Sequence, residues 1–176
     1  MKQNIDIEGL RIEHTVSILN ILEADEYILL TKTRCAHRNV SSEDLSEFHI
    51  FINEQSNAIN QIVEEVEEKV FALGQTRIGS LKEFLDLTHL AEQKQDYSNS
   101  IETTQNLIED HESIVNFLKD VLKIPHKPND FAESAFLADV LGKHEIMILE
   151  LKAFLSNKKP HSIRIPENDF KYAQAN

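Results

Sequence analysis

Residues 37–74, HRNVSSEDLSEFHIFINEQSNAINQIVEEVEEKVFALG, contain the pattern of a long amphipathic helix and four side chains that can bind a metal. The helix is predicted from Ser42, an N-cap residue type, to Gly74, which suits a left-handed C-terminal cap, with no Gly or Pro between them. Apolar residues recur at intervals of three and four, which indicates a buried stripe along one face. These residues are Leu45, Phe48, Ile52, Ile59, Ile62, Val63, Val66 and Val70.

The two histidines and two carboxylates of this stretch have a spacing that bears on function. His37 precedes His49 by twelve residues, and Glu64 and Glu68 lie one turn apart on the same helical face. At about 1.5 Å of rise per residue, His49 and Glu64 are roughly 22 Å apart along the helix, so they cannot share a metal ion within one chain. If a second copy packs antiparallel across a two-fold axis, His49 of one chain faces Glu64 and Glu68 of the other.

The rest of the chain predicts three more long helices and one short helix. Pro125 ends the third long helix, and Asn129 or Asp130 caps the fourth. The connection after the second helix is too long for a tight turn, and it contains a short helix, Leu81–Leu87, preceded by a Ser80 cap. The long helices are expected at about 7–39, 42–74, 98–123 and 129–156. The predicted fold is an all-α four-helix bundle with a short extra helix in the crossover between the second and third long helices.

Two runs of sequence resemble the Dps family of mini-ferritins, which oxidise iron and protect DNA in starved bacteria. They are EADEYILLTKTRCAHRNV, residues 23–40, and VEEVEEKVFALG, residues 63–74. The resemblance extends from the first helix to the end of the last, and it implies a ferritin-like bundle. It also implies an inter-subunit ferroxidase site, in which the iron ligands are His37 and His49 of one subunit and Glu64 and Glu68 of its neighbour.

The activity implied by this resemblance is iron oxidation and iron storage. The protein would bind Fe(II) at these sites, oxidise it with hydrogen peroxide in preference to dioxygen, and store the ferric mineral, which protects against oxidative stress. Glu54 and Glu65 are candidates for the interior carboxylates on which the mineral nucleates. The resemblance further implies a homo-oligomer, a dodecamer with the metal sites at two-fold dimer interfaces.

Four features depart from the family pattern, one of which is the missing glycine in the loop after Val40, where Ser41 and Ser42 stand. The Trp usual after the first histidine is Arg38, the usual aspartate is Glu64, and the acid usual one turn after the second histidine is Asn53. The remaining imidazoles and carboxylates suit iron, and the departures affect the expected rate and occupancy. A structural or DNA-compacting Dps-like shell with a weakened metal site is therefore an open alternative. Another is an unrelated four-helix scaffold in which the spacing of the four residues arose by chance.

Composition bears on partners and compartment. Thirty acidic residues against eighteen basic residues give a net charge of -12, which suits a protein that handles cations and disfavours DNA binding. A single cysteine cannot form an internal disulfide, which favours a reducing compartment. The sequence shows neither a signal-peptide pattern nor an apolar run of about 18 residues, so we expect a cytoplasmic protein without membrane association. The 176 residues predict one domain, 1–157, followed by an irregular tail, 158–176.

Other polar residues are expected to have structural roles. Cys35 is predicted to be a small buried side chain, and Arg34 and Arg38 are predicted to pair with surface carboxylates. By the family resemblance, His111 in the run EDHES is structural, and His144 is left out of the metal site. None of the eight histidines has a Glu three residues before it, which argues against a di-iron centre within one bundle.

Overall fold

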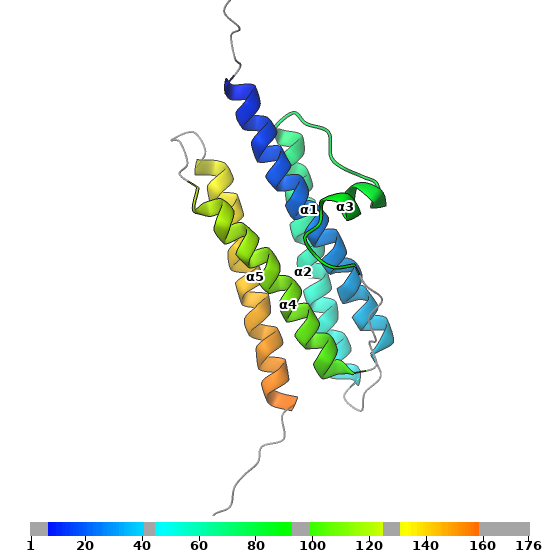
Figure 1. Cartoon of the computed structure of the whole chain (residues 1–176). Coiled ribbons are helices and arrows are strands. Elements are labelled where there is room, and N and C mark those ends of the chain that lie inside the picture. Colours follow the sequence, from blue (N-terminus) through cyan, green and yellow to red (C-terminus); the bar gives the residue numbers. More distant parts are fainter. Residues whose placement is uncertain (1–6, 41–44, 93–98, 125–130, 159–176) are drawn as a thin grey trace, which may run out of the picture.

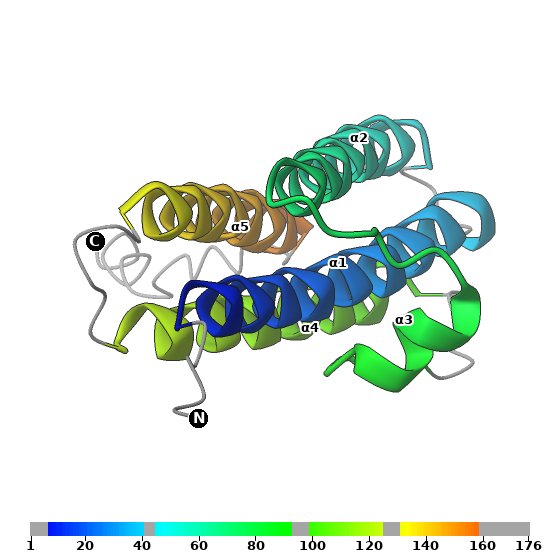
Figure 2. The same cartoon turned by 90° about the horizontal axis from the view of Figure 1, so that it is seen from above.

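The computed structural model describes residues 7–40, 45–92, 99–124 and 131–158. The helices in these ranges are α1 (Ile7–Asn39), α2 (Leu45–Ala72), α3 (Leu81–Leu87), α4 (Ser100–Leu122) and α5 (Phe131–Lys158). α1 pairs with α2 and α4 pairs with α5, and the two pairs pack side by side as a four-helix bundle (Figure 1). Seen end-on, α3 lies outside the bundle against α1 (Figure 2). The predicted all-α bundle with a short extra helix is confirmed. The predicted tail lies outside the described residues, apart from Lys158, which ends α5.

The C-terminal end of α2 has the cap that the sequence predicts. Gly74 has a φ of 75°, in the left-handed region that favours glycine. Its N–H donates to the carbonyl oxygen of Phe71 at 2.9 Å, and the N–H of Gln75 donates to that of Val70 at 3.3 Å. This pair of bonds is a Schellman motif, which satisfies carbonyl groups left without partners at the end of a helix. The cap predicted at Ser42 lies outside the described residues.

The crossover helix α3 begins with a capping box. The Oγ of Ser80 accepts a hydrogen bond from the N–H of Glu83 at 3.2 Å, and the N–H of Ser80 donates to the Glu83 carboxylate at 3.0 Å. The buried ring of Phe84 stacks on Tyr27 of α1, with 4.1 Å between ring centroids. The cap therefore starts the helix, and the aromatic contact holds it against α1.

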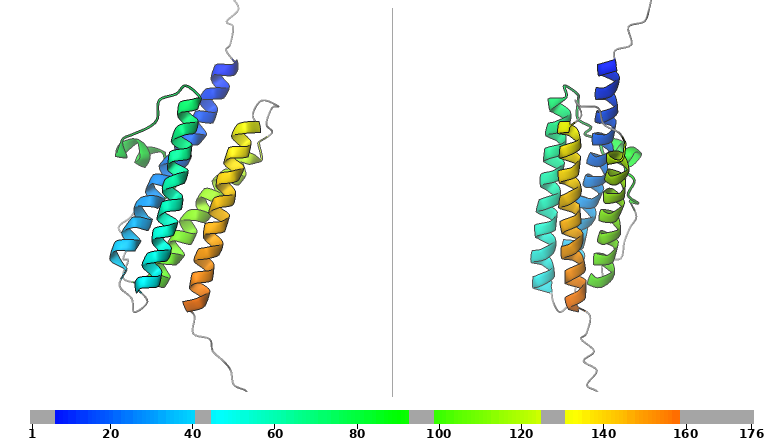
Figure 3. Two further views of the ribbon diagram at one scale, coloured as in Figure 1. Left: turned by 180° about the vertical axis from the view of Figure 1, so that it is seen from behind. Right: turned by 90° about the vertical axis from the view of Figure 1, so that its left-hand side faces the viewer.

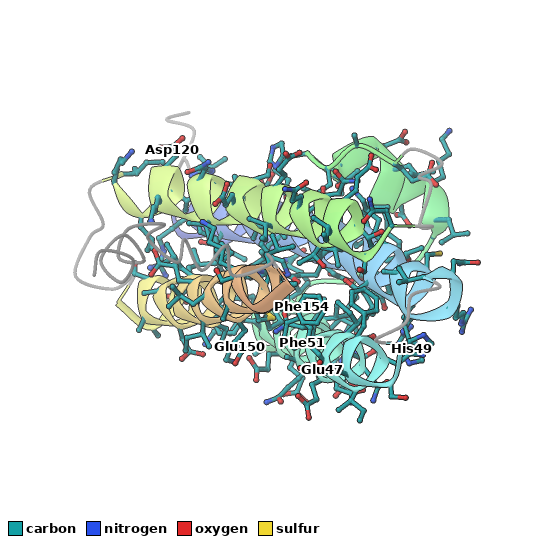
Figure 4. The ribbon with its side chains drawn as sticks, turned by 90° about the horizontal axis from the view of Figure 1, so that it is seen from below. Glu47, His49, Phe51, Asp120, Glu150 and Phe154 are labelled. Atoms are coloured by element: carbon teal, nitrogen blue, oxygen red, sulfur yellow. The ribbon has the colours of Figure 1, made fainter. Side chains whose placement is uncertain are left out.

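The apolar stripe of α2 forms much of the core. Its described members, from Phe48 to Val70, are at most 4% exposed. Viewed from behind, α2 and α5 run next to each other (Figure 3). Near one end of the bundle the rings of Phe51 and Phe154 stack with 5.3 Å between centroids (Figure 4). None of the described helices combines the length and apolarity needed to cross a membrane.

Three side chains differ from what the sequence suggests. Leu10 and Ile101, apolar residues within predicted helices, are 57% and 42% exposed. Each lies in the first turns of its helix, at an end of the bundle where fewer neighbours cover it. Cys35, predicted to be buried, is half-buried.

Candidate metal-binding site

His37 and His49 lie next to each other at one end of the bundle. His37 is in the last turn of α1, and His49 is near the start of α2. Their ring centroids are 4.6 Å apart, their planes are tilted by 48°, and both side chains are half-buried. Figure 4 shows His49 at the edge of α2, beside the end of α1. Because the chain reverses direction between the two helices, residues twelve positions apart become neighbours.

One ring nitrogen of His49 lacks a hydrogen-bond partner. Its Nε2 atom is buried, and no group of the described residues pairs with it. A buried polar atom without a partner costs about 1–3 kcal/mol. The unprotonated nitrogen of a neutral imidazole can accept a hydrogen bond or coordinate a metal ion, and either interaction would relieve this cost. This nitrogen is therefore open to a metal ion, as the predicted site requires.

Glu64 and Glu68 lie on the exposed part of α2, and Glu64 is held by a neighbour that the sequence analysis missed. The Nδ2 of Asn60 donates to Oε1 of Glu64 at 2.8 Å, and Oδ1 of Asn60 accepts a hydrogen bond from Arg34 at 3.2 Å. Arg34 therefore reaches the carboxylate through an amide, where the sequence analysis predicted a direct ion pair. The signal available in the sequence was the spacing of four between Asn60 and Glu64, which places them on the same helical face.

Glu68 borders an open hollow of about 410 Å³ on the α2 and α5 side of the bundle. In this hollow Lys143 of α5 forms ion pairs with Glu65 at 2.5 Å and with Asp139 at 3.1 Å. Glu65, a candidate for mineral nucleation, is therefore already neutralised by an ammonium group. The other residues that line the hollow are Lys69, Ala72 and Phe136.

A single chain does not complete the predicted site. In the ranges that the structure describes, no three His, Cys, Asp or Glu side chains converge on one metal position. The fold brings His37 to His49 and keeps Glu64 beside Glu68, but it leaves the two pairs apart along α2. The separation agrees with the helical spacing in the sequence, and the two-chain arrangement stays a prediction.

A buried carboxyl group lies on the same side of α1 as the crossover, and the sequence analysis missed it. Glu23 is fully buried, and neither of its carboxylate oxygens has a hydrogen-bond partner among the residues that the structure describes. Burial, followed by the nearby charge of Glu67, raises the pKa of Glu23 to about 7. Glu67 itself accepts a hydrogen bond from the hydroxyl of Tyr27 at 2.9 Å and lies 3.7 Å from Arg77. The only sequence signal was that Glu23 follows Leu19 by four residues, on the apolar face of α1.

A family model described as a ferritin-like domain matches residues 16–159. The chain belongs to the ferritin-like family. An uncharacterised low temperature-induced protein of Nostoc is 29% identical over 154 residues, which cover 85% of this chain and 86% of the relative. The DNA protection during starvation protein of Helicobacter pylori is 25% identical over 142 residues, 81% of this chain and 99% of the relative. The crystal structure of a Dps protein from Vibrio cholerae has a TM-score of 0.77 at 20% identity, covering 83% of this chain and 91% of that chain. This ferritin-like chain therefore has the fold of Dps proteins, and the resemblance seen in its sequence is confirmed.

Proposed function

We propose that this chain forms a Dps-type shell that binds Fe(II), oxidises it and stores the ferric product. The observation that carries the proposal is the His37–His49 pair, in which one buried imidazole nitrogen has no partner within the described part of the chain. Imidazole and carboxylate groups together suit iron. The Vibrio structure is described as a member of a superfamily of ferritin-like diiron-carboxylate proteins, which agrees with this chemistry. We place the protein in the cytoplasm.

The iron site would be completed by two subunits. His37 and His49 of one subunit would face Glu64 and Glu68 of its neighbour, and an isologous interface would form two such sites per dimer. Exposed apolar side chains on α2 support an assembly that covers them, since Ile50 is 64% exposed and Phe71 is 67% exposed in the single chain. The Dps resemblance makes a dodecamer the expected assembly.

Iron enters this reaction as the substrate. Two Fe(II) ions would each lose one electron, and one molecule of hydrogen peroxide would accept both electrons as its O–O bond breaks, so that its oxygens leave as water or hydroxide. The carboxylates of Glu64 and Glu68 would offset part of the metal charge, which rises on oxidation. Consuming Fe(II) together with peroxide removes both reagents that generate hydroxyl radicals. Dioxygen is the alternative oxidant.

A structural or DNA-compacting shell with a weakened metal site is the second candidate. Two observations favour it: an arginine, Arg38, is exposed where the family has a tryptophan, and one oxygen of Glu64 already accepts a hydrogen bond from Asn60. The net charge of -12 weighs against direct DNA binding.

Stopped-flow absorbance of the apo-protein separates the two candidates. The assembled protein receives about two Fe(II) per subunit, one for each metal position of a two-metal site, with peroxide or with air. The proposal predicts oxidation well above the rate in buffer, and loss of that acceleration in His49→Ala and in Glu68→Ala with the assembly intact. Glu109→Ala, which removes an exposed carboxylate of α4, is the matched control and is expected to keep full activity. A wild-type rate equal to that in buffer would favour the structural shell.

A further inference from the structure

Three ionisable side chains outside the set of proposed iron ligands form a continuous hydrogen-bonded chain in the core, which we name the core triad. Glu26 of α1, His144 of α5 and His111 of α4 are each at most 1% exposed. The Nε2 of His144 lies 2.6 Å from Oε1 of Glu26, and the Nδ1 of His144 lies 2.8 Å from the Nδ1 of His111. The core triad therefore connects α1 to both helices of the α4–α5 pair.

The geometry limits how many protons the core triad can hold. Each of its two contacts requires one proton between the two facing atoms. With Glu26 ionised, His144 donates through Nε2, and His111 donates through Nδ1 to the free Nδ1 of His144. One further proton can be held on the outer nitrogen of His111, because both contacts stay satisfied. The next proton would put N–H groups on both facing Nδ1 atoms, and that contact would break.

The surroundings of the core triad also disfavour additional positive charge. Burial, followed by the charge of His144, lowers the pKa of His111 well below its ordinary value. Asp110, the neighbour of His111 on α4, is already held by Lys32 of α1 in a buried hydrogen-bonded ion pair at 2.7 Å. On the α2 side, the same core is built from apolar side chains that include Ile62 and Val66. A fully protonated triad therefore has no additional anionic partner among these groups, and Glu26 is its one carboxylate.

We propose that the core triad is a pH-sensitive contact that holds the α4–α5 pair against α1 at neutral pH and releases it in acid. In the closed bundle the two imidazoles cannot both be fully protonated, whereas in an opened bundle both are free to take up protons from water. The stabilisation is complete above the ordinary histidine pKa of about 6.5 and is lost as the pH falls below it. One histidine that is protonated only in the open state raises the opening equilibrium constant about thirtyfold between pH 7.5 and pH 5.0.

Hydrogen exchange of the full-length assembly, followed by mass spectrometry at pH 7.5 and 5.0, measures this opening directly. After correction for intrinsic exchange rates, peptides from α4 of the wild type are expected to open about thirtyfold more at pH 5.0. His111→Asn keeps an N–H near the Nδ1 position but cannot take up a proton, so it is expected to lose most of this increase while staying closed at pH 7.5. His14→Asn, at an exposed position of α1, is the matched control and is expected to keep the wild-type increase.

A second variant covers the case in which His111→Asn does not fold. His144→Gln keeps a donor to Glu26 but removes the facing Nδ1, and it is expected to show a smaller increase at pH 5.0 than the wild type, because only His111 is left to take up a proton on opening. Light scattering at both pH values confirms that the exchange is measured on intact assemblies. The proposal is overturned if the wild type shows no increase in α4, or if a folded variant shows the same increase as the wild type.

Discussion

Replacing Glu23 by glutamine should stabilise this protein in a pH-dependent manner. The fully buried carboxyl group has no hydrogen-bond partner in the described ranges, and burial together with the charge of Glu67 raises its pKa from 4.5 to about 7. At about 1.4 kcal/mol per pH unit, this difference corresponds to about 3 kcal/mol. A raised carboxyl pKa means that the folded state binds more protons than the unfolded state between pH 4.5 and 7. The contribution of this carboxyl group to the free energy of unfolding is therefore complete below pH 4.5, and it is lost as the pH rises to about 7.

The assay compares the free energy of unfolding of wild type and Glu23→Gln in urea at several pH values and one protein concentration. Glutamine is neutral throughout, so the variant should gain little at pH 4.5 and up to about 3 kcal/mol at pH 8. For a chain of this size, the same gain raises the thermal midpoint by about 6–12 °C. Glu13→Gln, at an exposed position of α1, should show no such trend. A difference between Glu23→Gln and wild type that stays constant with pH would refute the burial argument.

Three further predictions follow from particular contacts. Gly74→Ala should lower the free energy of unfolding by about 1–2 kcal/mol in urea titrations, since φ there is 75° and alanine is strained in that region. Lys32→Ala should lower the free energy of unfolding by about 3–5 kcal/mol, because the substitution leaves Asp110 buried without its partner. The double variant Lys32→Met, Asp110→Leu should recover most of that loss. Asn60→Ala frees the Glu64 carboxylate to rotate, so it should weaken the binding of Zn²⁺, a redox-inert probe, by about 10-fold in calorimetry. If the amide positions Glu64, Asn60→Gln should restore part of the affinity.

The helices could be predicted from the sequence because their signals are local. The apolar stripe of α2, the glycine cap at Gly74 and the serine cap at Ser80 depend on residues within a few positions of one another, and the structure confirms them. The adjacency of His37 and His49 also follows from a short reversal between two helices, and the rings lie 4.6 Å apart.

The core triad and Glu23 could not be predicted in this way. Glu26 lies on the apolar face of α1, and its partner His144 is 118 positions away in the sequence. From the sequence alone, a carboxylate at such a position is expected to be exposed, because the packing of α4 and α5 against α1 is not yet known. The meeting of His49 with Glu64 and Glu68 is a different case, because it depends on a second chain and therefore remains a prediction.

Subunit complementation tests the inter-subunit site most directly. His49→Ala and Glu68→Ala chains are unfolded together, reassembled in equal amounts and assayed for iron oxidation, beside each variant reassembled alone. In a dimer that combines the two variants, one site has both mutations and the other has neither. Random pairing therefore predicts that about a quarter of the sites, and of the wild-type activity, returns in the mixture, while each variant alone stays inactive. Activity in the mixture no higher than in either variant alone would contradict a site shared between subunits.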